Sequence, residues 1–462
     1  MNDYLDRPII LVIFGITGDL SQRKLLPALY HLVKHHQLPK NLAIVGISRK
    51  NVPVSEVYGG LKTRIHGDDY DKTVVEELHK ATRMLQVDLD KSNDYARLLE
   101  KLRDISDELG PGVSRLYYLS IPSQAFVSVV HHLGETGHHE PFGQDGERPR
   151  LLVEKPFGYD VASAETLVKA VDEHFGEQQV FRIDHYLAKE TAQNILTFRF
   201  QNPLFQSIWN ARHIESIQIV AYETIGIEKR SVFYEQTGAL RDILQSHLMQ
   251  LLALITMEKP AALESHDIHK AKLRLLESID PIEPEEVGTK AVRGQYDSYK
   301  NEVSNQHSHV ETFARLHLNI DNEQWRGVKV TIETGKALHE KCTEIIVRFR
   351  ANEDAPGTNA LTFRVQPQEG ITLSLQAKRP GLTKETETVR MDFDYERAFY
   401  GLAGEAYERV IIDAVRGDQS LFATAQEVLT SWRIVENVIQ AWAADGKNLR
   451  LYPVGSPANE IV

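Results

Sequence analysis

The first third of the chain alternates apolar runs of strand length with stretches of helical periodicity. The first apolar run starts after Pro8, ends in a glycine turn and is followed by Leu25, Leu29 and Leu32 at helical spacing. Four further buried strands are predicted at residues 42–47, 84–89, 116–121 and 151–153. Strands that are apolar on both faces and alternate with helices pair in parallel, so the pattern predicts an α/β, doubly wound parallel sheet.

After about residue 180 the hydrophobic pattern changes to a period of two. The alternating segments are HIESIQIVAYE, GVKVTIETG, SLQAK and VRMDF, and helical patterns flank them at residues 239–257 and 405–442. Such alternation is typical of an antiparallel sheet with one solvated face. We therefore predict two domains, residues 1–181 and residues 182–462, the second of α+β type, with a ligand cleft where they meet near Arg182.

Composition and charge narrow the possible partners. The chain has 462 residues, with 53 Lys and Arg against 65 Asp and Glu, a net charge of −12. This field repels nucleic acid and anionic lipid, so neither is expected as a partner. The single cysteine, Cys342, excludes an intrachain disulfide and fits a reducing cytoplasm. No apolar run approaches the ~20 residues of a membrane span, and the charged start MNDYLDRP is unlike a secretory signal.

A glycine-containing turn after the first strand is the candidate cofactor site. It consists of Gly15, Ile16, Thr17, Gly18, Asp19 and Leu20. Glycines here let backbone N–H groups approach a pyrophosphate, although a purely structural turn would look the same. The second strand runs into Ser48 and Arg49 with no acidic residue to hold a ribose 2′-hydroxyl. That ending favours NADP over NAD, unless Arg49 is an ordinary solvated loop residue.

Two segments near the predicted junction are candidate substrate sites. Lys155 follows the fifth strand, at the edge where open α/β sheets bind ligands, although Lys-Pro turns are also common on surfaces. If a helix begins near Asp184, His185 and Lys189 are i,i+4 neighbours, and with the free N–H groups of the first turn they form a phosphate site. In the alternative interpretation Asp184 is an N-cap and Lys189 is solvated.

His247 is the candidate base. It lies in the apolar stripe of the predicted helix 239–257, formed by Ile243, Leu244, Leu248 and Leu251, so its imidazole points to the interior or to a cleft wall. A hydrogen-bonded core histidine would occupy the same position. Other histidine pairs, among them His131 and His132 or His138 and His139, have no third acidic or thiolate ligand at a recognised spacing. No metal is expected.

Several of these segments together resemble the glucose-6-phosphate dehydrogenase family. The matching stretches are FGITGDL, VEKPFG, RIDHYLAKE, GALRDILQSHLMQLL, HVETFARLHLNIDNEQWRGV, TGKALHEK and AYERVIIDAVRGDQSLF, spread from residue 14 to about residue 422 in the family's order. The resemblance implies a Rossmann-like NADP-binding domain followed by a β+α domain with a large sheet. It also implies NADP-dependent oxidation of β-D-glucose 6-phosphate at C1 to 6-phosphogluconolactone, without a metal, by a homodimer or homotetramer.

The resemblance also implies roles for individual residues. His247 matches the general base and Asp184 its carboxylate partner, while His185, Tyr186 and Lys189 match the phosphate-binding residues. The matching residues of the sugar site are Glu223, Asp242, Lys336 and Lys341. The residues expected at the cofactor site are Gly15, Thr17, Gly18, Asp19, Leu20, Ser48, Arg49, Asp88 and Leu89. Lys155 matches a lysine that contacts both ligands, and its bond to Pro156 is expected to be cis.

The chain departs from the family's pattern at several positions near the implied sugar site. Ala188 replaces a usual glycine, Ser246 replaces a usual asparagine, and residues 228–234 replace a glycine-rich segment. These departures leave open a related dehydrogenase that prefers another hexose 6-phosphate or uses NAD. A second alternative is a paralogue that binds NADP without turnover, against which the retained His247 argues, because a pure binder needs no base.

Overall fold

The computed structural model describes residues 3–65, 69–142, 146–351, 357–399, 405–444 and 448–461. The chain forms two compact units. The first comprises Met1–Gly158, Ala162–Ala188 and Gly404–Ala425, and the second comprises Tyr159–Val161, Lys189–Ala403 and Gln426–Val462. The division predicted after residue 181 lies inside the first unit, which continues to Ala188 and takes up a segment from near the C-terminus.

A six-stranded parallel sheet forms the centre of the first unit, as the apolar runs predict. Its strand order is β3-β2-β1-β4-β5-β6. The strands are β1 (Ile9–Phe14), β2 (Leu42–Ser48), β3 (Thr82–Gln86), β4 (Ser114–Leu119), β5 (Arg150–Val153) and β6 (Val180–Arg182). β3 begins two residues before its predicted start and ends at Gln86. β6 was not predicted, because a strand of three residues is too short to give a periodic signal.

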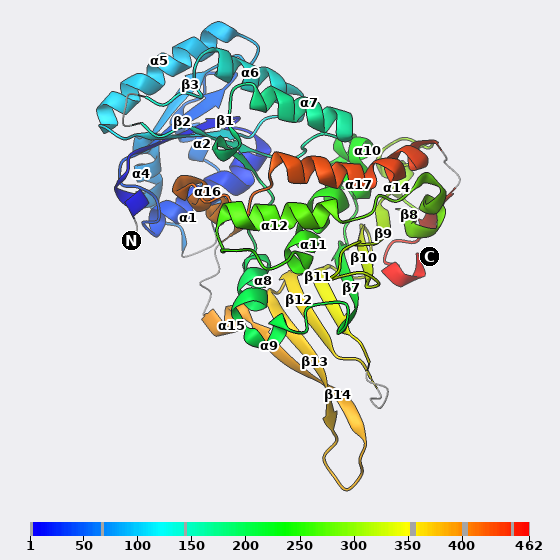
Figure 1. Ribbon diagram of the computed structural model, residues 1–462. Coiled ribbons are helices and arrows are strands. Elements are labelled where there is room, and N and C mark those ends of the chain that lie inside the picture. Colours follow the sequence, from blue (N-terminus) through cyan, green and yellow to red (C-terminus); the bar gives the residue numbers. More distant parts are fainter. Residues whose placement is uncertain are drawn as a thin grey trace. The chain divides into compact units, whose positions relative to one another are not determined.

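Alternate residues of β1 are buried against opposite helical layers, because side chains along a strand point to opposite faces. Ile9, Leu11 and Ile13 share a core with α1 (Leu26–Lys34), α4 (Lys72–Ala81) and α16 (Ala406–Arg416). Ile10, Val12 and Phe14 share another with α5 (Ser92–Leu109), α6 (Phe126–Glu135) and α7 (Val161–Asp172). The two groups of helices lie on opposite sides of the sheet (Figure 1). The short helices α2 (Val54–Tyr58) and α3 (Leu61–Arg64) complete the first layer.

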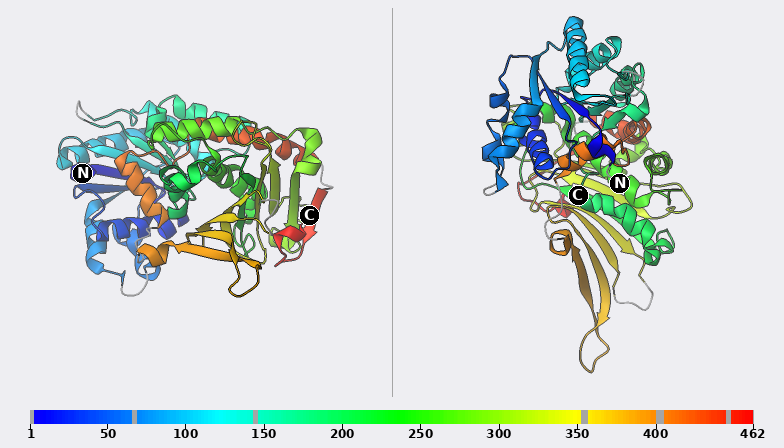
Figure 2. Two further views of the ribbon diagram at one scale, coloured as in Figure 1. Left: turned by 60° about the horizontal axis from the view of Figure 1, so that its bottom comes forward. Right: turned by 90° about the vertical axis from the view of Figure 1, so that its left-hand side faces the viewer.

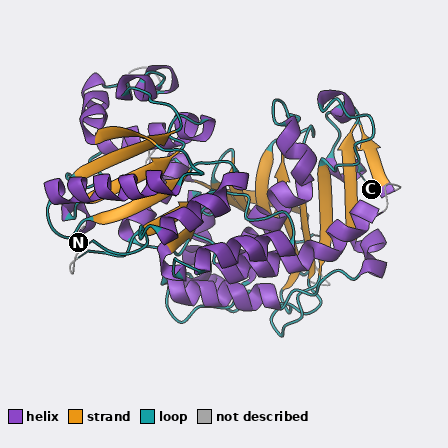
Figure 3. Cartoon of the chain, turned by 90° about the horizontal axis from the view of Figure 1, so that it is seen from above, coloured by secondary structure: helices purple, strands orange, loops and turns teal. Residues whose placement is uncertain are grey.

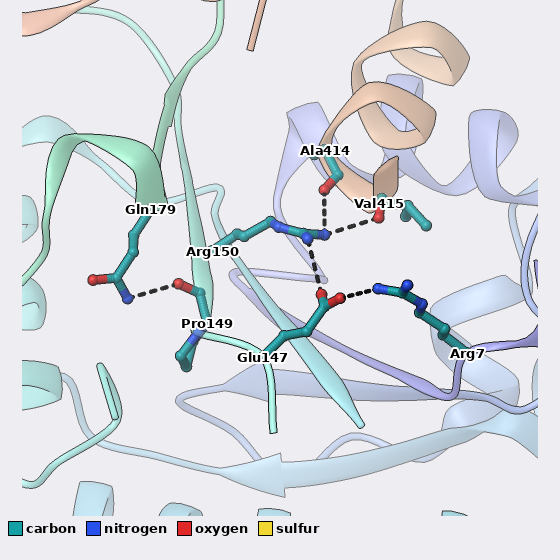
Figure 4. Close-up of polar contacts among 7 residues, drawn as sticks. All are labelled: Arg7, Glu147, Pro149, Arg150, Gln179, Ala414 and Val415. Atoms are coloured by element: carbon teal, nitrogen blue, oxygen red, sulfur yellow. Dashed lines mark hydrogen bonds and ion pairs between the residues drawn. The ribbon is translucent and has the colours of Figure 1, made fainter. Parts of the chain in front are cut away.

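Arg150 fastens α16 to the sheet of the first unit, although the two are far apart in sequence. Its guanidinium donates to the carbonyl oxygens of Ala414 and Val415 at 3.0 and 2.8 Å, and to Glu147 at 2.9 Å (Figure 4). Arg150 thus adds a donor to two carbonyls of the last helical turn, of which Ala414 also accepts from the N–H of Gly417 at 3.3 Å. Gly417, at φ 78°, ends α16, so the helical pattern predicted over 405–442 is two helices, with α17 at Ala425–Ala444.

A nine-stranded mixed sheet forms the second unit, in the order β14-β13-β12-β11-β7-β10-β9-β8-β15. Neighbouring strands are antiparallel except in the pairs β7/β10 and β8/β15. The strands are β7 (Ile214–Tyr222), β8 (Ala291–Tyr296), β9 (Phe313–Leu318), β10 (Lys329–Gly335), β11 (Cys342–Phe349), β12 (Ala360–Gln366), β13 (Gly370–Lys378), β14 (Thr386–Asp394) and β15 (Leu449–Tyr452). The mainly antiparallel sheet predicted from the period-two segments is confirmed.

Helices cover one side of this sheet (Figure 3). They include α8 (Glu190–Gln201), α11 (Met249–Thr256), α12 (Ser265–Glu277) and α17. Inside the helical layer, Lys272 of α12 and Glu427 of α17 form a fully buried ion pair of 2.9 Å. The smaller helices are α9 (Pro203–Gln206), α10 (Ser231–Ala239), α13 (Val287–Lys290), α14 (Tyr299–Glu302) and α15 (Tyr395–Phe399). The β13–β14 hairpin extends beyond the helices (Figure 2), and most of β14 is exposed.

The opposite face of the sheet is polar. A cavity of about 470 Å³ on it is lined by side chains that include Gln218, Tyr222, Arg315, Glu333 and Arg348. Among the described residues, no helix is long and apolar enough to span a membrane.

Candidate active site

The turn after β1 requires glycine at its first position. Gly15 has a φ of 78°, and a Cβ there would overlap the carbonyl oxygen of Ser120, which follows β4. Gly18 N–H and the Ser21 hydroxyl both donate to the Gly15 carbonyl, at 2.8 and 3.0 Å. β1 and β4 are the neighbours at which the strand order reverses, the place where open α/β sheets bind ligands. The backbone here therefore suits close approach by a dinucleotide.

A helix follows this turn directly. It opens with a π-helical turn at Ser21–Leu25 and continues as α1. Thr17 and Asp19 are exposed at its beginning, and Leu20 is half-buried. The predicted succession of strand, glycine turn and helix is confirmed.

The ends of β2 and β3 bring the other expected cofactor residues together. Ser48 is buried, and its hydroxyl accepts from the N–H of Lys50 at 3.2 Å, while the Arg49 side chain is exposed. The hydrogen bond from Lys91 is the main cause that lowers the pKa of Asp88, and the charge of Arg49 adds to it. The following residue, Leu89, accepts a hydrogen bond from Tyr95 at 3.0 Å. Arg49 and Asp88 are therefore electrostatic neighbours at one edge of the sheet.

Lys155 leaves the carboxyl end of β5, and its bond to Pro156 is cis, as expected. The preceding Glu154 accepts hydrogen bonds from Tyr118 of β4 and Tyr407 of α16. Burial is the main cause that raises the pKa of Glu154 to about 7, and the nearby Asp184 adds to it. The sequence interpretation missed Glu154 because its two tyrosine partners lie far away along the chain.

The segment that follows β6 differs from its prediction. The helix does not begin near Asp184: α8 starts at Glu190, and residues 185–188 form turns. The Asp184 carboxylate accepts from the N–H of Tyr186 at 3.0 Å, a local bond that favours a turn over a helix. His185 and Lys189 are therefore not i,i+4 neighbours on a helix. Asp184 and Tyr186 are buried, and His185 is half-buried.

Lys189 is the N-cap residue of α8 and lies beside a carboxylate. Its Nζ is 3.7 Å from Glu369 Oε1, and the N–H of Thr191 donates to Glu369 Oε2 at 2.9 Å. The start of α8 and the Lys189 ammonium together bind one anionic side chain. This is the combination of charge and free N–H groups that anions favour.

Two adjacent parallel strands of the second unit end in oppositely charged residues. β7 and β10 pair through Tyr222 and Gly335, and the next residues, Glu223 and Lys336, form an ion pair. Lys336 is buried, and Glu223 is one-third exposed. Lys341, further along the same loop, is exposed.

The expected base lies on an unusual helix. Residues Leu240–Leu248 form a π-helix, which carries both Asp242 and His247. The interior position predicted for His247 is confirmed, since its side chain is 1% exposed. The apolar face predicted for this helix is wrong in part. The wider π turn leaves Ile243 half-buried and buries Gln245 in addition. π-helical turns occur frequently at functional sites.

Tyr234 and Glu311 belong to this site and were missed. The Tyr234 ring lies 5.4 Å from Lys336 Nζ. The pKa of Tyr234 is raised well above its usual value, mainly by burial and then by the charges of Asp242 and Glu311. Glu311 accepts from the N–H of Leu240 at 3.0 Å, at the beginning of the π-helix. Gly238, with φ 65°, leaves room for the Glu311 carboxylate. The sequence signals were this glycine just before the helix and the place of Glu311 in the matching stretch HVETFARLHLNIDNEQWRGV.

Family models match both parts of the chain. The glucose-6-phosphate dehydrogenase NAD-binding domain matches residues 12–194, and the C-terminal domain of the same family matches residues 196–460. The chain belongs to the glucose-6-phosphate dehydrogenase family.

Individual relatives agree with this assignment. Glucose-6-phosphate 1-dehydrogenase of Chlamydia muridarum is 38% identical, over 94% of this chain and 90% of the relative. Glucose-6-phosphate 1-dehydrogenase 2 of Mycobacterium bovis is also 38% identical, over 95% of this chain and 89% of that relative. A solved glucose-6-phosphate dehydrogenase in complex with its substrate glucose-6-phosphate has a TM-score of 0.92 and 32% identity, covering 99% of this chain and 96% of that one.

Proposed function

We propose that this member of the glucose-6-phosphate dehydrogenase family oxidises β-D-glucose 6-phosphate at C1 to 6-phosphogluconolactone and reduces NADP, the first step of the oxidative pentose phosphate pathway. The observation that carries the proposal is the cluster in the second unit. There Glu223, Lys336 and Asp242 gather around Tyr234, and Asp242 shares its π-helix with His247. Carboxylates and an ammonium at one edge of a sheet suit the hydroxyl groups of a sugar, and a buried imidazole beside them suits proton removal.

The chemistry follows from these residue types. His247 accepts the proton of the C1 hydroxyl while the C1–H bond breaks and its hydride leaves. NADP, when bound, would supply the hydride acceptor. In this proposal Asp184 is the carboxylate partner of the base, with the role that the carboxylate has in a hydrolase triad. The Asp184 assignment rests on its match to the family's motif.

Phosphate binding is assigned to His185, Tyr186 and Lys189. Lys189 and the first turn of α8 bind the carboxylate of Glu369, which supports their use for an anion. A dianionic ester supplies binding energy remote from C1, which fixes the sugar against the nicotinamide. Lys155 and Lys341 would contribute further positive charge.

NADP is proposed as the preferred cofactor. Gly15 and Gly18 would allow the pyrophosphate to approach the start of the helix after β1, with Thr17, Asp19 and Leu20 lining the turn. The exposed Arg49 would pair with the 2′-phosphate, beside Ser48, while Asp88 and Leu89 would border the adenosine.

The remaining proposals concern location and assembly. The single cysteine supports a reducing cytoplasm as the location. A homodimer or homotetramer through the large sheet is also proposed, from the resemblance to the family.

A steady-state assay of the purified protein tests the function. With glucose 6-phosphate and NADP, the absorbance of reduced nicotinamide should rise. The rise should be slower when another hexose 6-phosphate or free glucose replaces the substrate, or when NAD replaces NADP.

His247→Asn should lower kcat by about 10²–10⁴ with little change in affinity for the sugar phosphate. Arg49→Ala should raise KM for NADP far more than KM for NAD. Near-normal turnover by His247→Asn would refute the base, and tight NADP binding without turnover of any sugar phosphate would refute the activity.

A further inference from the structure

Three potential metal ligands meet on the surface of the first unit, and none of them is assigned to the reaction. His131 lies on α6, and Glu173 and His174 follow α7. One ligand atom from each of the three side chains lies within 4.8 Å of the others. Along the sequence, His131 has no third ligand at a recognised spacing; the fold brings Glu173 and His174 to it from about forty residues away.

The backbone beneath these side chains is fixed. Val130 and Leu133, which flank His131, are fully buried, and so is Phe175, which follows His174. All three belong to one hydrophobic core of the first unit. The N–H groups of Glu173 and His174 donate to Lys169 and Val171 at 3.1 Å each. Since the ligands project from anchored backbone, little backbone conformational entropy would be lost on binding an ion.

Gly134 makes room for one of the ligands. A Cβ at position 134 would overlap the imidazole ring of His174, so the ring occupies the space that the glycine leaves open on α6. The His131 and His174 rings lie 5.9 Å apart, and so do the His139 and His174 rings. Glu135 lies one turn after His131, and its carboxylate is 3.2 Å from the Nε2 atom of His131. It can orient that ring, as outer carboxylates do at metal centres.

We propose that His131, Glu173 and His174 bind a divalent transition-metal ion, with Zn²⁺ as the best match. Two imidazoles and one carboxylate form a borderline nitrogen and oxygen donor set that suits Zn²⁺, Co²⁺ or Ni²⁺, whereas Mg²⁺ and Ca²⁺ prefer oxygen alone. The exposed position of His131 and Glu173 leaves room for water as the fourth ligand.

The site is structural in effect and takes no part in hydride transfer. α6 follows β4 and α7 precedes β6, so the end of α6 and the residues after α7 lie toward the amino ends of the parallel strands. The cofactor turn at Gly15 lies at the carboxyl ends. A bound ion would cross-link α6 to the end of α7 and stabilise the first unit by mass action.

Zinc titration of metal-stripped protein, followed by calorimetry and thermal unfolding, tests the proposal. The parent should bind one Zn²⁺ with a rise in Tm that EDTA reverses. His131→Ala, Glu173→Gln and His174→Ala should each weaken that binding by at least about tenfold, the loss that removal of even an outer partner brings. Co²⁺ in place of Zn²⁺ should give the visible absorption of a tetrahedral site in the parent but not in these three ligand variants.

Two further variants separate this site from general binding by surface histidines. Gly134→Ala keeps all three ligands but should displace the His174 ring and abolish the site. His266→Gln alters an exposed histidine outside this cluster, which pairs with Asp267 at 3.2 Å. This variant should bind Zn²⁺ like the parent. Circular dichroism without metal should show all variants folded. Zinc binding of unchanged affinity and stoichiometry in the three ligand variants would overturn the proposal.

Discussion

The Tyr234 hydroxyl is buried and has no hydrogen-bond partner among the described residues. A buried donor without a partner costs about 1–3 kcal/mol, so Tyr234→Phe should raise the free energy of unfolding of the ligand-free protein by about 1 kcal/mol. If the hydroxyl donates to the sugar, the same change should raise KM for glucose 6-phosphate. Urea unfolding and steady-state kinetics measure the two effects, and Tyr117→Phe is the control, because its hydroxyl is within 2.8 Å of His138. That variant should lose stability.

Individual site residues were predictable where the signal is local. The buried position of His247 follows from the apolar residues around it, and the glycine turn follows from residues adjacent in sequence. Glu311 and Glu154 could not be predicted, because each acts through partners far along the chain: Leu240 for Glu311, and Tyr118 and Tyr407 for Glu154.

At the scale of elements, Gly238 sets the start of the π-helix that carries Asp242 and His247. Alanine at this position would have to adopt φ 65° and would overlap the Glu311 carboxylate. With ψ −175° this backbone lies in a region that essentially only glycine adopts, so Gly238→Ala should destabilise the fold by about 1–3 kcal/mol or more and lower kcat as the helix shifts. Gly288→Ala is the matched control, since nothing lies within 4 Å of its added Cβ. Equal activity of the two variants would show that the helix start is not fixed by Gly238.

Arg150 holds α16 on the first unit, and its removal tests that attachment. Arg150→Ala leaves the carbonyls of Ala414 and Val415 without this donor, which should cost about 2–4 kcal/mol in unfolding free energy. Lys24→Ala removes an exposed contact of 4.0 Å with Glu405 at the other end of the helix and should change stability by less than about 0.5 kcal/mol. Urea unfolding compares the two. A loss for Arg150→Ala as small as for Lys24→Ala would mean that other contacts hold α16.

At the scale of the whole molecule, buried carboxyls make stability depend on pH. Burial is the main cause that raises the pKa of Glu154 and Glu408 to about 7 and of Asp413 to about 6. The folded protein therefore holds protons that the unfolded chain has released above its ordinary carboxyl pKa of about 4.5, so the contribution of these three carboxyls to stability falls as pH rises from about 4.5 to about 7. His138 contributes in the opposite direction, because burial lowers its pKa to about 3.

Glu154→Gln should flatten this fall, because the amide does not titrate. The measurement is the free energy of unfolding in urea at several pH values between 5 and 8. Glu76→Gln, which alters an exposed ion pair with Lys72, should keep the slope of the parent. A slope that is the same in Glu154→Gln and in the parent would show that Glu154 is ionised throughout this range in the folded protein.

The sequence by itself determined the parallel sheet of the first unit, the mainly antiparallel sheet of the second, the glycine turn after β1 and the interior position of His247. These features depend on periodicity and on turn residues, which act over a few neighbouring positions. Only the tertiary structure decided that α16 returns to the first unit, that Tyr234 and Glu311 join the site, and that His131 meets His174. Periodicity states which side of an element is buried, but the partner it is buried against depends on the path of the whole chain.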